Sequence, residues 1–104
     1  MTAIPEELIA IIETKKHVMS KMDITVKYIT GQTKVYDNFE ASDYIIRLKE
    51  RIQFTEGTPI DFQQMIYQNK KLDDMATFQD VGITPSSIDK TIYVCYKLGR
   101  YNKN

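Results

Sequence analysis

The spacing of apolar residues changes at Met22, and this change constrains the fold more than any other feature of the sequence. Up to that point apolar residues recur every three or four positions, which predicts an amphipathic helix. From there Ile24, Val26 and Tyr28 alternate with polar residues, which predicts a strand with one buried face. The chain is therefore predicted to have three parts: an N-terminal amphipathic helical extension (1–21), a folded domain (22–98) and a short polar tail (99–104).

Further elements are predicted within the domain. A turn at Gly31 leads into a second strand, whose alternation breaks at Asp37 and Asn38, so we expect a β-bulge there. Ser42 and Asp43 are predicted to cap the one long helix of the domain. The expected elements after the first strand are a strand at 33–39, a helix ending before residue 57, a strand at 63–67, a strand stub at 71–72, a helical turn at 77–81 and a last strand at 91–98.

This order predicts an α+β fold in which a mixed sheet of four to five strands packs on one helix. The core should consist of the apolar residues that recur with these periods, because periodic apolar positions report burial. The expected core residues are Ile24, Val26, Phe39, Ile45, Leu48, Ile52, Met65, Leu72, Phe78, Ile83, Ile92 and Val94.

Composition excludes several classes of protein. The 104 residues suffice for one domain, and 14 Lys and Arg balance 14 Asp and Glu, which argues against a generic nucleic-acid binder. No apolar run approaches the roughly 20 residues of a membrane span, and the N-terminus does not resemble a secretory signal. Cys95 is the only cysteine, which excludes an intrachain disulfide. We therefore expect an intracellular protein, cytoplasmic or nuclear.

One series of residues, spaced along most of the domain, carries a family resemblance. Its members, in order, are Ile29, Thr30, Gly31 and Thr33 at the first hairpin; Ser42, Asp43, Ile45, Leu48, Lys49, Ile52 and Gln53 at the helix; Glu56, Gly57, Thr58 and Pro59 at its exit; and Gln63, Ile66, Tyr67, Lys70, Leu72, Asp74, Phe78, Asp80 and Ile83 beyond it. With these residues in this order, residues 22–98 resemble ubiquitin and its relatives over their whole length. The resemblance implies the β-grasp fold, with two departures in spacing: one extra residue near Asp37 and about three in the loop at 85–90.

The resemblance also implies a partner-binding surface. The residues that ubiquitin receptors contact correspond to Ile29, Ile66 and Cys95, with Tyr93 beside them in place of a histidine of the family. Small exposed apolar patches with a polar rim are common docking sites. The alternative interpretation is that these side chains only cover the sheet.

The end of the domain bears on covalent conjugation, since modifiers of this family end in Gly-Gly. Here Lys97 and Leu98 are followed by Gly99 and then Arg100, so Gly99 is a conjugation terminus only if the residues after it are removed. Lys70 matches the family lysine most associated with chain linkage, but an exposed lysine is also the ordinary choice for solubility.

No catalytic, metal or cofactor site is expected. His17 is the only histidine, and nothing in the spacing brings it to Cys95 as a nucleophile pair would require. One histidine, one cysteine and scattered acids make no recognisable metal set, and no glycine-rich loop offers a phosphate site for a small-molecule substrate.

The leading hypothesis is a non-catalytic ubiquitin-like module that docks on proteins recognising ubiquitin-like folds. Two alternatives stay open: a covalent modifier conjugated to target lysines after trimming to Gly99, and a ubiquitin mimic that occupies enzymes of the conjugation pathway. The apolar stripe of the N-terminal extension also allows self-association, because two such helices could bury each other's apolar faces.

Overall fold

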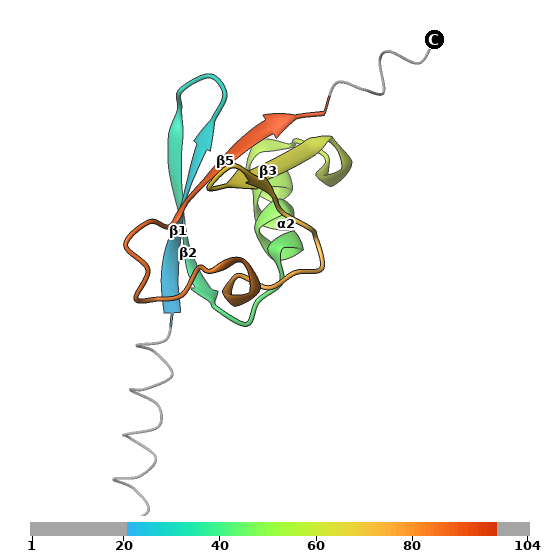
Figure 1. The fold of residues 1–104 in the computed structure, drawn as a ribbon. Helices are drawn as coiled ribbons and strands as arrows, with labels where there is room; N and C mark the ends of the chain where they lie inside the picture. The colour runs from blue at the N-terminus through green and yellow to red at the C-terminus, as the bar shows by residue number, and fades with distance from the viewer. Residues whose placement is uncertain (1–20, 98–104) are drawn as a thin grey trace, which may run out of the picture.

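The computed structural model describes residues 21–97, in which five strands form one mixed sheet and a helix packs across one side of it (Figure 1). The predicted helical extension, except Lys21, and the predicted tail lie outside the described residues. The elements in chain order are β1 (Lys21–Tyr28), β2 (Thr33–Glu40), α2 (Ile45–Glu56), η1 (Ile60–Phe62), β3 (Gln63–Tyr67), β4 (Lys70–Lys71), η2 (Gln79–Val81) and β5 (Thr91–Tyr96).

The strands lie in the order β2-β1-β5-β3-β4. The last strand, β5, runs parallel to β1 and antiparallel to β3, while β1–β2 and β3–β4 are antiparallel pairs. Strands from both ends of the domain therefore meet at the centre of the sheet. The predicted α+β fold, a mixed sheet packed on one helix, is confirmed.

The β1–β2 hairpin contains the predicted bulge. Met22 pairs with Phe39 and Ile24 pairs with Tyr36, so β2 holds one residue more than β1 between these two pairs. Asn38 takes up the extra residue with a φ of 72°, a left-handed conformation that asparagine tolerates better than most residues. The bulge keeps both aromatic side chains of β2 on the buried side of the sheet.

The start of α2 differs from the prediction that Ser42 and Asp43 cap the helix. The N-cap is Tyr44, which has an extended backbone and makes no side-chain capping hydrogen bond. Instead the N–H of Ile45 donates to the carbonyl oxygen of Ala76 at 2.8 Å. A loop some thirty residues further along the chain thus satisfies the free amide at the helix start.

Two strand boundaries also differ from the predictions. The strand stub is Lys70–Lys71 rather than 71–72; the buried Leu72 follows it, and its N–H donates to the carbonyl oxygen of Met65 at 2.9 Å. The last strand ends at Tyr96, two residues earlier than expected.

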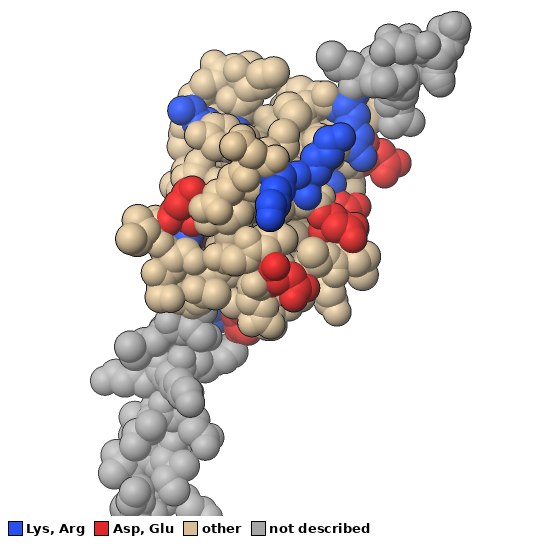
Figure 2. Space-filling view, in the orientation of Figure 1, with Lys and Arg blue, Asp and Glu red and all other residues tan. Residues whose placement is uncertain are grey.

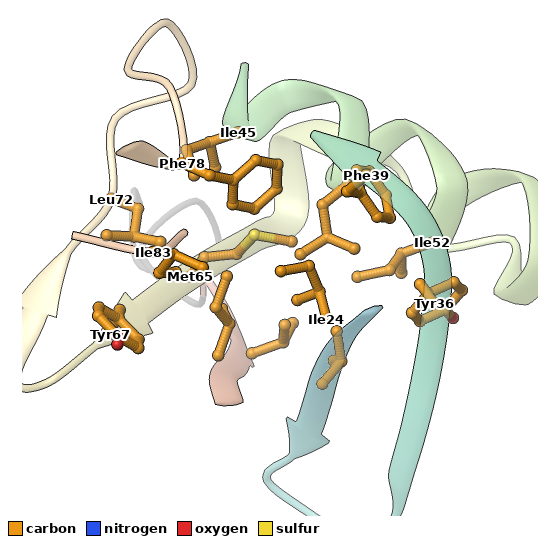
Figure 3. Close-up of a cluster of buried hydrophobic side chains, with 14 of the residues drawn as sticks. Ile24, Tyr36, Phe39, Ile45, Ile52, Met65, Tyr67, Leu72, Phe78 and Ile83 are labelled. Atoms are coloured by element: carbon orange, nitrogen blue, oxygen red, sulfur yellow. The ribbon is translucent and has the colours of Figure 1, made fainter. Parts of the chain in front are cut away.

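The core lies between the sheet and α2, where aliphatic and aromatic side chains from both layers point toward one another (Figure 3). All twelve expected core residues are buried. Phe39 and Phe78 pack edge to face, with ring centroids 5.5 Å apart. The core also contains four apolar residues that the sequence analysis did not include: Met22, Tyr28, Tyr36 and Tyr67.

Candidate interaction surface

The side of the sheet that faces away from α2, here called the outer face, carries the side chains that alternate with the buried ones. Strand pairing places Lys27 of β1 beside Tyr93 of β5, Tyr93 beside Ile66 of β3, and Ile66 beside Lys71 of β4. Side chains at paired positions lie about 5 Å apart on the same face of a sheet. These four residues therefore form a row across four strands.

Three of the four predicted partner-binding residues lie together on the outer face. Ile66 and Tyr93 are paired, and Cys95 lies two residues beyond Tyr93, on the same side of β5 and opposite Gln64. Tyr93 is 49% exposed, whereas Ile66 and Cys95 are half-buried. Ile29, which is 72% exposed, follows β1 at the hairpin turn and so lies at the edge of this surface.

Lysines without an ion-pair partner border the apolar part of the outer face. The ammonium group of Lys27 lies 5.9 Å from the centroid of the Tyr93 ring, a cation–π contact. Lys70, Lys71 and Lys97 form no ion pair with any residue in the range 21–97. Figure 2 shows a band of Lys and Arg in the region of β3 and the end of β5, with acidic residues beside it.

Two shallow hollows flank β4 and adjoin this basic band. One, of about 350 Å³, is lined by Gln64, Lys71 and Lys97 together with the Lys49 and Asp74 pair. The other, of about 230 Å³, lies on the opposite side of Lys71, between β4 and η2. The strip beside the outer face is thus hollowed and lined in part by lysine side chains, an arrangement that suits an acidic partner segment.

The lysines at family positions differ in accessibility. Lys70, the predicted chain-linkage residue, is exposed on β4. Lys49 is only 3% exposed, and its ammonium group lies 2.5 Å from the carboxylate of Asp74. The amine of Lys49 is therefore shielded from any conjugating enzyme in the folded domain, whereas that of Lys70 is open.

A chain of hydroxyl groups connects β1, β2 and α2 behind the outer face. The hydroxyl of Tyr28 lies 3.1 Å from that of Tyr36, which lies 3.0 Å from the hydroxyl of Thr55. Burial, and next the hydrogen bond with Tyr36, raises the pKa of Tyr28 above its usual range. The hydrogen bonds between these hydroxyl groups join the hairpin to the helix.

Few side chains in the described part of the chain are of the kinds that act as nucleophiles or metal ligands. The thiol of Cys95 lies 3.8 Å from the backbone carbonyl oxygen of Gln64. Between residues 21 and 97 there is no cluster of three or more side chains that could bind a metal ion. No helix in the same range is long and apolar enough to cross a membrane. His17 and Gly99 lie outside the described residues.

Comparison with known proteins agrees with this architecture. The model of the ubiquitin family matches residues 24–91, which cover most of the sheet and all of α2. The chain belongs to the ubiquitin family. It is 34% identical over 59 residues to the NEDD8-like protein RUB1 of Saccharomyces cerevisiae, a match spanning 57% of this chain and 75% of that protein. It is also 34% identical over 67 residues to the NEDD8-like protein RUB3 of Arabidopsis thaliana, across 64% of this chain and 85% of that protein.

The family match ends at Thr91, so Tyr93 and Cys95 lie beyond it. The pairing of β5 with β1 and β3 nevertheless places both residues in register with the rest of the outer face. Sequence reasoning missed Lys71 and Lys97 as members of this surface. The prediction of a strand at 71–72 gave a signal for Lys71, because it placed an exposed lysine beside β3.

Proposed function

We propose that this member of the ubiquitin family is a non-catalytic docking module, which binds proteins that recognise ubiquitin-like folds through its outer face. One observation carries the proposal: Ile66, Tyr93 and Cys95 lie side by side on the solvent side of the sheet. Apolar and aromatic side chains surrounded by polar ones are typical of the centre of a binding site.

The surrounding charges support the same interpretation. Lys27, Lys71 and Lys97 border the apolar centre and have no ion-pair partner among residues 21–97. A basic border around an apolar centre selects partners with acidic residues beside their apolar contact, and it accelerates association at low salt.

The proposal is tested by the affinity of the full chain for purified ubiquitin-binding domains. Tyr93→Ala and Ile66→Asp should each weaken binding by about tenfold or more, as expected for residues at the centre of an interface. Phe54→Asp is the matched control, because Phe54 is 88% exposed on α2, across the domain from the outer face. Unchanged affinity in a folded Tyr93→Ala variant, or an equal loss in the control, contradicts the proposal.

A second candidate function is that of a covalent modifier. It is favoured by the relatives, both of which are named NEDD8-like proteins, and by the order of Leu98 and Gly99 at the end of the domain. Gly99 is a single glycine that comes earlier than the Gly-Gly of the family's modifiers, and Arg100 follows it. If Gly99 becomes the conjugated terminus, Gly99→Ala should remove every lysine-linked adduct in cells, and adducts that persist in this variant exclude conjugation through Gly99.

A further inference from the structure

We propose that the start of α2 carries a second protein-binding surface, which takes a partner segment with apolar side chains beside lysine or arginine. Its centre consists of Tyr44, Ile46 and Met75, here called the α2-start patch. The patch lies on the side of the sheet that α2 covers, and the outer face lies on the other side (Figure 1). The inference therefore goes beyond the proposed function and does not rest on it.

Backbone contacts bring the three residues of the patch together. Tyr44 forms an antiparallel β-bridge with Thr77. The N–H of Ile46 donates to the carbonyl oxygen of Asp74 at 3.1 Å, and Met75 is the next residue of that loop. The loop is thus held against the first turn of α2, with Met75 beside it.

These apolar side chains are accessible to a partner. Tyr44 is 47% exposed and Met75 is 63% exposed, while Ile46 is half-buried. Single exposed apolar residues are ordinary on a protein surface, whereas several that lie together mark a candidate docking site. Aromatic residues and methionine are also enriched at the centres of protein interfaces.

Negative charge surrounds the patch. The segments 43–50 and 73–80 contain five Asp and Glu but only two Lys and Arg. Both cations form ion pairs with acids of the same segments. The remaining acids form no ion pair with any residue in the range 21–97, and they are Glu50, Asp73 and Asp80. Asp73 and Asp80 also line the two hollows beside β4, so the negative region borders the basic band there.

Two of these carboxylates are positioned next to the apolar residues. Glu50 follows Ile46 by one turn of α2, so both lie on the same side of the helix. The backbone N–H of Thr77, the bridge partner of Tyr44, donates to the carboxylate of Asp80 at 3.0 Å and lowers the pKa of that carboxyl. An acidic border of this kind repels nucleic acids and anionic membranes, and it favours a protein segment that carries cations beside its apolar residues.

The test uses a short amphipathic peptide of leucine and lysine, in which leucine recurs at spacings of three and four. The ¹⁵N-labelled full chain is titrated with this peptide, and a peptide with glutamate in place of lysine is the charge-reversed control. The largest amide shifts should fall within the segments 43–50 and 73–80. The glutamate peptide should leave both segments unchanged.

Paired variants test the residues of the patch. Tyr44→Ala/Met75→Ala should weaken binding of the lysine peptide by about tenfold or more. The matched control is Phe54→Ala/Ile88→Ala, which removes two side chains that are 88% and 103% exposed elsewhere on the surface. This control should bind the peptide like the full chain, and so should Tyr93→Ala on the outer face.

The inference is overturned if the lysine peptide does not bind, if the largest shifts lie outside the two segments, or if the glutamate peptide binds equally well. An equal loss of affinity in the control variant or in Tyr93→Ala also overturns it. These outcomes leave the proposed function untouched, because that function is measured with ubiquitin-binding domains on the opposite side of the sheet.

Discussion

At the scale of single residues, the hydroxyl groups of Tyr28, Tyr36 and Thr55 form a chain that runs from the buried Tyr28–Tyr36 pair to the exposed Thr55, and its middle member, Tyr36, bonds to both others. Tyr36→Phe should lower the free energy of unfolding by about 1–3 kcal/mol, because it leaves the buried hydroxyl of Tyr28 without this partner. Tyr28→Phe should lower it by only about 0.5–1.5 kcal/mol, because Tyr36 keeps its bond to Thr55.

The double variant Tyr28→Phe/Tyr36→Phe should lose less than the sum of the two single losses, since no buried hydroxyl is then left unpaired between these two positions. Urea denaturation of the four proteins measures this coupling. Strictly additive losses contradict the description of these hydroxyl groups as one network.

Ionisation of Tyr67 is expected to lower the stability of the fold at alkaline pH. Burial, and next the charge of Asp89, raises the pKa of Tyr67 above its ordinary value, and its hydroxyl donates to the backbone carbonyl oxygen of Asp89 at 2.7 Å. The unfolded chain therefore loses this proton first, at pH values above about 10. The contribution of Tyr67 to stability is fully present below that pH and is lost as the pH rises through the folded pKa.

Tyr67→Phe should consequently flatten the fall of the unfolding free energy above about pH 10, by at most about 1.4 kcal/mol per pH unit. Denaturant titrations of both proteins at neutral and alkaline pH measure the two slopes. Parallel curves for the two proteins would show that Tyr67 does not titrate differently on unfolding.

Residue-scale features were the hardest to predict from the sequence. Lys49 looks like an ordinary charged residue on a helix, and only the folded loop that brings Asp74 to it explains its burial. The burial of the Tyr28 and Tyr36 hydroxyl groups could not be predicted either, because each hydroxyl is the hydrogen-bond partner of the other across two strands.

At the scale of elements, α2 is held at its start by the loop that precedes η2. The N–H of Ile46 donates to the backbone carbonyl oxygen of Asp74 at 3.1 Å, and the carboxylate of Asp74 pairs with the buried ammonium group of Lys49. One loop residue thus joins the first turns of the helix to the far edge of the sheet.

Asp74→Ala should lower the free energy of unfolding by about 1.5–3 kcal/mol, because it leaves the buried Lys49 without its charged partner. Asp73→Ala is the matched control: Asp73 is the exposed neighbour, and its loss should change stability by less than about 0.5 kcal/mol. Thermal or urea unfolding separates the two variants. Equal effects of the two substitutions contradict the structural role of the ion pair.

Elements were predicted well where the signal was local. The alternation of β1 and the break at Asp37 and Asn38 were visible in the sequence, and both the strand and the bulge are confirmed. The start of α2 was predicted wrongly, because the acceptor for Ile45 comes from Ala76 rather than from the neighbouring Asp43. Periodicity also could not place β5 between β1 and β3, because strand order depends on contacts between residues that are distant in sequence.

At the scale of the whole molecule, the outer face is assembled from four strands, of which β1 and β5 come from opposite ends of the domain. The residues of its row, Lys27, Tyr93, Ile66 and Lys71, come from β1, β5, β3 and β4. The resemblance named Ile66, Tyr93 and Cys95 in advance. It could not show that the neighbouring lysines lack ion-pair partners, because pairing depends on where every surrounding acid lies after folding.

The central claim, that the outer face is a protein-binding surface, is tested most directly by residue-resolved NMR. The ¹⁵N-labelled full chain is titrated with a purified ubiquitin-binding domain, and the amide shift of each residue is followed. The largest shifts should occur at Ile66, Tyr93 and Cys95, with Phe54 on α2 unaffected. Binding that shifts the residues of α2 and leaves the outer face unchanged would contradict the claim.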